Sequence, residues 1–202
     1  MWDGYLTAIA EFIETHPEIE AKIVVDRFHV AQNYRNNFDQ LRKSEFRRLR
    51  QELSSETYHD VVKGNHWLLR HNHASLSEEE RKKLRTLFVY SPQLHQAYSL
   101  REELTAIFEL PLTVTQGANR LQKWIDKVLR LNSLGFDKFI KTLRNHFAYI
   151  ANYFHTRANS GFVEGLNNKL KLITRRSFGL KRVDSLFSRL WLNLQGRTQF
   201  CS

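Results

Sequence analysis

The sequence predicts a mainly α-helical protein with one short strand. Three prolines and eight glycines in 202 residues leave few breaks, which favours long helices over a many-stranded fold. Apolar residues recur at helical spacing over most of the chain. Only residues 22–26, KIVVD, form the β-branched run of a buried strand. Such a strand needs neighbours for its backbone hydrogen bonds, so either this prediction is wrong or the chain lacks part of its sheet.

The N-terminal elements follow from apolar spacing. Residues 4–15 are predicted to form a short amphipathic helix that ends before Pro17, and the strand at 22–26 comes next. A long helix is expected from about residue 31, with a strongly basic stretch between Arg42 and Arg50. Its apolar positions are Tyr34, Phe38, Leu41, Leu49 and Leu53.

Two later helices carry recognisable start signals. Ser77 with Glu80 three residues on is a capping box, which predicts a helix start at this point. Ser91 followed by Pro92 predicts a second start, because proline suits the first helical position, and Pro111 ends that helix.

The remaining helices are predicted from periodicity alone. One helix contains residues 121–128, a single long helix spans 136–154, another covers 161–173, and a last one contains 183–194. Three tryptophans of the chain fall within apolar helical patterns and are predicted to be core residues: Trp67, Trp124 and Trp191.

The charge balance indicates a polyanionic partner. Lys and Arg number 31 against 21 Asp and Glu, a net charge of +10, which suits DNA, RNA or an acidic membrane. No apolar run is long enough to span a bilayer and the N-terminus lacks a signal peptide, so we expect a soluble, cytoplasmic protein. The single cysteine, Cys201, excludes an internal disulfide and a cysteine-based zinc site.

The segment SGFVEGLNNKLKLITRRSFG, residues 160–179, contains one carboxylate among amides and cations. As a helix it places Glu164, Asn168, Lys171 and Arg175 in one stripe, with Asn167 beside it and the apolar residues opposite. A lone carboxylate would repel a phosphate, but it fits if a divalent cation lies between the two. The alternative is that Glu164 pairs with a neighbouring side chain on a solvated helix.

A second polar pair follows the predicted strand. Asp26 and His29 stand three residues apart where a parallel strand would end, the edge at which ligands bind in open α/β sheets. The pair could bind a metal, orient another group, or only cap the next helix. His66, His71 and His73 also cluster, but they lack partner carboxylates and are interpreted as a polar loop.

These stretches together resemble a known family. The segments KIVVDRFHV and YFHTRANSGFVEGLNNKLKLITRRSFG strongly resemble the C-terminal half of DDE transposases of bacterial insertion sequences, specifically the ISL-three group. HWLLRHNHASLSEEERKKL and SPQLHQAYSLREEL look like the helical insertion of that group. The resemblance extends from about Met1 to Leu194.

The resemblance implies the C-terminal fragment of an RNase H-like α/β domain with a large all-helical insertion. Residues 1–30 would be an RNase H-like segment, 31–140 the insertion, and 141–202 the RNase H-like C-terminal helices. In that family three acids surround two Mg²⁺ ions, and water and then a DNA 3′-hydroxyl attack phosphodiester bonds in line. The implied partners are the DNA ends of an insertion sequence and either a second copy or an intact transposase.

By the same resemblance, Glu164 is the third catalytic acid and a metal ligand, and Asp26 with His29 is a supporting signature. The implied DNA-binding residues are Asn167, Asn168, Lys169, Lys171, Arg175 and Arg176.

The chain departs from the family pattern at its start. A catalytic aspartate of the family immediately precedes a Met-Trp pair, and here that pair is Met1 and Trp2. The resemblance thus places two of the three catalytic acids upstream of Met1, so we expect an inactive piece, either a remnant or a reading frame started too late. Two alternatives are a non-catalytic DNA-binding protein that interferes with an intact transposase, and a helical module that dimerises through its aromatic faces.

Overall fold

The structure, a computed structural model, describes residues 3–18, 22–131, 135–157, 161–176 and 182–200. It divides into two compact units, residues 1–158 and 159–202, and each is described by itself. Within the described part of the chain, every helix is too short or too polar to cross a membrane.

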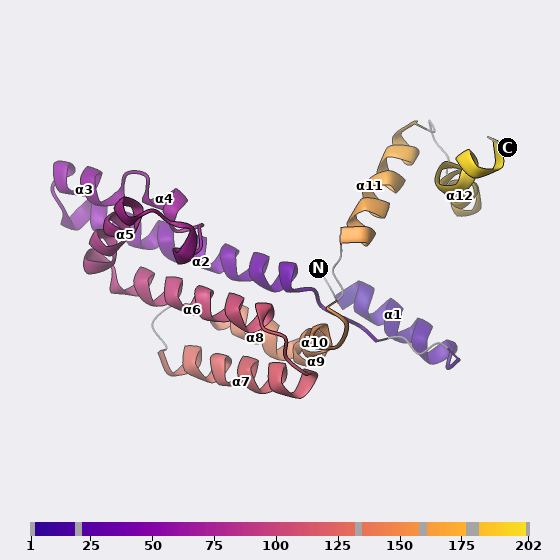
Figure 1. Cartoon of the computed structure of the whole chain (residues 1–202), viewed down its shortest axis with the longest axis horizontal. Coiled ribbons are helices and arrows are strands. Elements are labelled where there is room, and N and C mark those ends of the chain that lie inside the picture. The colour runs from indigo at the N-terminus through magenta and orange to yellow at the C-terminus, as the bar shows by residue number, and fades with distance from the viewer. Residues whose placement is uncertain (1–2, 19–21, 132–134, 158–160, 177–181, 201–202) are drawn as a thin grey trace. The chain divides into compact units, whose positions relative to one another are not determined.

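The first unit holds most of the helices (Figure 1). They are α1 (Asp3–Thr15), α2 (Arg27–Glu52), α3 (Ser55–Val62), α4 (Asn65–Leu68), the 3₁₀ turn η1 (His73–Ser75), α5 (Glu78–Tyr90), α6 (Pro92–Glu109), α7 (Val114–Leu131), α8 (Asp137–Asn145), α9 (Phe147–Ala151) and α10 (Tyr153–Thr156). The second unit contains α11 (Gly161–Arg176) and α12 (Val183–Phe200), which contact each other.

The core of the first unit forms where α2, α6, α7 and α8 meet. Tyr34 of α2 lies at its centre, with ring centroids 6.0 Å from Trp124, 5.2 Å from Phe136 and 5.3 Å from Phe139. Its hydroxyl donates to the carbonyl of Ala97 on α6 at 2.6 Å. Because a buried hydroxyl is costly when unpaired, this bond fixes α2 against α6 while the rings supply the apolar contact.

The predicted helix starts are confirmed. The Ser77 hydroxyl accepts from the Glu80 backbone N–H, and the Glu80 carboxylate accepts from the Ser77 N–H at 2.8 Å, which completes the capping box of α5. Ser91 caps α6 and Pro92 is its first residue. These signals act within one turn of helix, so local sequence suffices to predict them.

The predicted strand at residues 22–26 is wrong. The segment is extended but joins no sheet, and the described residues contain no strand at all. Its backbone is satisfied by helices instead: the Val25 N–H donates to the Tyr149 carbonyl at 2.9 Å, and the Asn152 amide donates to the Ile23 carbonyl at 2.9 Å. Tyr149 is available because the last carbonyls of a helix lack intrahelical donors.

The predicted single helix over 136–154 is also wrong, because it consists of α8, α9 and α10. The backbone leaves helical geometry at His146, with φ −112° and ψ 17°. Apolar spacing continues across the break, so the pattern alone does not reveal it. The short helices expose the carbonyl and amide groups that hold residues 22–26.

The mainly α prediction is therefore confirmed for the described residues, and the RNase H-like α/β part of it stays a prediction. Of the tryptophans predicted to be core residues, Trp124 is buried, whereas Trp67 and Trp191 are 57% and 59% exposed. The prediction is wrong for these two, because helical spacing identifies a face and not what covers it.

Candidate nucleic-acid interface

Helix α11 presents a polar row, here defined as Asn167, Asn168, Lys171, Arg175 and Arg176. All five side chains are exposed. On the apolar side Ile173 is buried, and Leu166 and Leu170 are half-buried. The predicted amphipathic division is confirmed at these positions. The backbone of Glu164 belongs to α11, but its side chain, like that of Phe162, lies outside the described side chains.

Lys169 differs from the residues of the polar row. It is half-buried, and its ammonium donates to the backbone carbonyl of Asn193 on α12 at 3.1 Å. Asn193 lies in the middle of α12, and a backbone carbonyl has two lone pairs, so it can accept this bond besides one within its own helix. Lys169 thus ties α11 to α12, and its predicted contact with DNA stays a prediction.

Asp26 and His29 belong to the first unit. The Asp26 carboxylate is 7% exposed and accepts from the Phe28 N–H at 3.0 Å, so it is the N-cap of α2. This is one of the roles that the sequence left open for it. His29 is half-buried on the first turn of α2 and lines a cavity of about 270 Å³ with Asn33 and His146. The supporting role that the resemblance implies for this pair stays a prediction.

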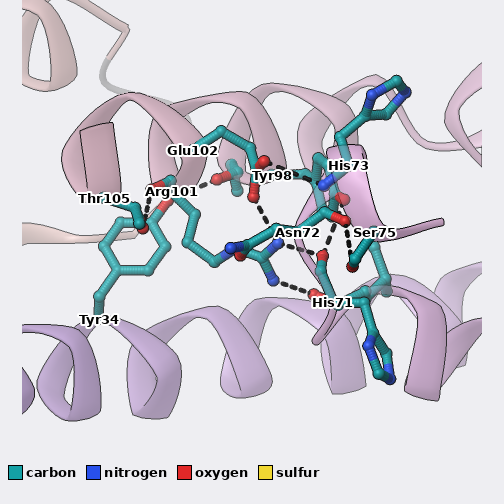
Figure 2. A network of polar contacts seen from close by, with 11 residues as sticks. Tyr34, His71, Asn72, His73, Ser75, Tyr98, Arg101, Glu102 and Thr105 are labelled. Atoms are coloured by element: carbon teal, nitrogen blue, oxygen red, sulfur yellow. Dashed lines mark hydrogen bonds and ion pairs between the residues drawn. The ribbon is translucent and has the colours of Figure 1, made fainter. Parts of the chain in front are cut away.

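Polar contacts from Arg101 of α6 hold the segment that contains His71 and His73 (Figure 2). The Arg101 guanidinium donates to the carbonyls of Leu69 and His71, and it lies 2.7 Å from the Glu102 carboxylate. Glu102 also accepts from the His73 N–H at 3.0 Å. The side chains of His71 and His73 are exposed, as predicted for a polar loop. The network instead holds their backbone, through the His71 carbonyl and the His73 N–H.

Sequence reasoning missed two cations in the first unit, Arg35 on α2 and Arg70 after α4. Both are exposed and both line the same two cavities. Neither stands in a basic run, so composition gave no reason to select them. The one signal was an aromatic residue close to each in the sequence, Phe28 before Arg35 and Trp67 before Arg70.

Both the family model and the curated proteins that match this chain are described as transposases. A family model for ISL3-type DDE transposases, described as a transposase, matches residues 1–190. The transposase for insertion sequence element IS1001 of Bordetella parapertussis is 27% identical over 187 residues, which cover 91% of this chain and 44% of that protein. The transposase for insertion sequence element IS1557 of Mycobacterium tuberculosis (strain CDC 1551 / Oshkosh) is 27% identical over 135 residues, covering 67% of this chain and 30% of that protein.

No solved structure matches this chain significantly. The chain spans less than half the length of these curated relatives. The family model nevertheless covers nearly all of it, including the predicted strand segment, the residues predicted to form a helical insertion, and α11. The chain therefore belongs to the ISL3-type family of DDE transposases.

Proposed function

We propose that this chain takes part in DNA transposition and supplies Glu164 as one acid of a magnesium-dependent site that cleaves and joins DNA strands. Membership of the family supports this role, as do the names of both relatives. The observation that carries it is the polar row of α11, where exposed amides and cations share a helix with Glu164.

The donor set of the polar row suits a phosphodiester. Lys171, Arg175 and Arg176 donate charged hydrogen bonds to phosphate oxygens, and Asn167 and Asn168 add neutral donors. These contacts hold and orient the strand without reading its sequence. Glu164 would weaken them by repulsion, unless a divalent cation binds the carboxylate and the phosphate together.

The described side chains do not form a magnesium site alone. Among them, no group of three or more carboxylate, imidazole or thiol side chains gathers in one place. The carboxylate of Asp26 is engaged as a helix cap. Glu164 would thus act with acids from outside the described side chains, and bound Mg²⁺ would supply neutralisation of the charge that develops on the phosphate.

Salt-dependent DNA binding tests the role of the polar row. We would measure the affinity of the full chain for a short labelled duplex over a salt series, and compare K171Q/R175Q with the control R120Q/K123Q. The control removes the same charge from exposed positions on α7. Affinity falls as salt rises, and each lost phosphate contact makes the slope of log affinity against log salt less steep by about 0.9. K171Q/R175Q should therefore make it less steep by about 1.8.

The control should change the slope far less. If the wild type does not bind DNA, or if both variants give the same slope, the polar row has no such role.

A further inference from the structure

Two adjoining cavities of the first unit share three arginines. The larger is about 280 Å³ and the smaller about 230 Å³, and Arg35, Arg70 and Arg101 line both. These residues come from α2, from the segment after α4, and from α6. We call the two cavities together the arginine groove.

Arg35 and Arg70 are held by aromatic rings. The Arg35 guanidinium lies 6.0 Å from the ring centroid of Phe28, and that of Arg70 lies 5.2 Å from the centroid of Trp67. Both rings are large, exposed apolar groups, 48% and 57% exposed. A cation–π contact uses none of the guanidinium N–H donors as hydrogen bonds to a polar partner, so these donors stay available to a ligand.

Several other arginines of the unit have carboxylate partners. Arg42 lies 2.6 Å from Asp39, and Arg85 lies 2.6 Å from Glu78. Among the described side chains, no carboxylate lies within 4.0 Å of Arg35 or Arg70. Their charge is therefore less compensated than that of the paired arginines, and it faces a concave surface.

Arg101, the third arginine of the groove, is buried and paired with Glu102, so it contributes mainly structure and little uncompensated charge. Arg101 is 8% exposed, and besides Glu102 its donors go to the backbone carbonyls of Leu69 and His71. These bonds fix the backbone on both sides of Arg70, so Arg101 acts as a positioning residue for it. The carboxylate that lines the groove, Asp39, is bound by Arg42 and Lys43.

We propose that the arginine groove binds the phosphate backbone of DNA, as a second contact surface in addition to the polar row of α11. The inference rests on the proposed function, because that function makes DNA the ligand of this chain. Guanidinium N–H groups, with the amides of Gln32 and Asn36 in the same lining, match the oxygens of a phosphodiester. The contacts position the strand and carry no sequence preference.

The test compares the full chain with R35Q/R70Q and the control R120Q/K123Q, using a short labelled duplex, EDTA and a salt series. Both variants remove two positive charges from exposed positions, so each has the same net charge. We expect R35Q/R70Q to lose affinity about tenfold and to lower the salt slope by about 1.8, with little effect of the control. R35K/R70K keeps the charge, so it should recover the slope, and it also controls for a folding defect in the glutamine variant.

Equal DNA affinities and equal salt slopes for R35Q/R70Q and the control would overturn the proposal that the arginine groove binds DNA. Binding of inorganic phosphate distinguishes the ligand sources: phosphate binding that is lost in R35Q/R70Q, together with an unchanged DNA affinity of that variant, would show a site for free phosphate instead of DNA. The variant K171Q/R175Q separates the two proposals, since its effect belongs to α11 alone. A wild-type chain without DNA affinity would overturn both.

Discussion

Ser91 makes two interactions that one substitution removes together. Its side chain is fully buried, its hydroxyl oxygen accepts from the Leu94 N–H at 3.3 Å as the N-cap of α6, and its O–H donates to the Glu45 carboxylate at 2.6 Å. Ser91→Ala therefore uncaps α6 and takes a donor from a buried carboxylate. Ser54→Ala is the matched control, because Ser54 caps α3 at an exposed position through the Thr57 N–H at 3.2 Å.

The two substitutions should differ in magnitude. Loss of a serine cap costs about 1 kcal/mol. Loss of a hydrogen bond to a buried charged group costs about 1.5–3 kcal/mol more, since the carboxylate keeps its desolvation cost without the donor. We therefore expect Ser91→Ala to lower the free energy of unfolding by about 3 kcal/mol and Ser54→Ala by about 1 kcal/mol.

The difference should also depend on pH. Burial raises the pKa of Glu45, but hydrogen bonds from Arg48 and Ser91 and the charge of Arg48 together hold it below its ordinary value of 4.5. A carboxyl with a lowered folded-state pKa stabilises the fold above that ordinary value, and this contribution is lost as pH falls. Without the Ser91 donor the lowering is smaller, so the variant should lose less of its remaining stability in acid.

Urea unfolding followed by far-UV circular dichroism measures both effects, at neutral pH and below pH 4.5. Equal losses for Ser91→Ala and Ser54→Ala at neutral pH would refute the reasoning. An unchanged acid profile for Ser91→Ala would refute the part that concerns Glu45.

Two further predictions concern close contacts. A Cβ at Gly117 would lie 2.3 Å from the Phe154 ring, so Gly117→Ala should destabilise the first unit by about 1–3 kcal/mol in urea unfolding despite the better helix propensity of alanine; a stabilised variant would contradict this contact. Lys171→Met should weaken DNA binding more than Lys169→Met does, because the Lys169 ammonium is bonded to Asn193; anisotropy titrations giving the reverse order would contradict that assignment.

Local signals in the sequence predicted the helix starts correctly. The incorrect predictions concern segments whose structure depends on contacts between residues far apart in the sequence. Ser77 and Ser91 act on residues three positions away, so the sequence contains all the information about those caps. The extended segment at 22–26 depends on Tyr149 and Asn152, more than a hundred positions later, and its β-branched composition is equally suited to a strand.

The candidate site was predictable in part for the same reason. Helical periodicity placed the polar row on the exposed side of α11, because that property belongs to one helix. The bond between Lys169 and α12 involves a second helix and left no trace in the local pattern. Arg35 and Arg70 share a groove because α2 packs on α6 and Arg101 of α6 holds the backbone on both sides of Arg70, and no short motif in the sequence encodes that arrangement.

The central claim is that Glu164 works with a divalent cation at a DNA phosphate. The most direct measurement is the DNA affinity of the wild type and Glu164→Gln, each in EDTA and in Mg²⁺ at equal ionic strength. The account predicts that Glu164→Gln binds more tightly than the wild type in EDTA, because repulsion is removed, and that Mg²⁺ increases the affinity of the wild type alone. Identical responses of both proteins to Mg²⁺ would contradict the claim and leave Glu164 as a side chain on a solvated helix.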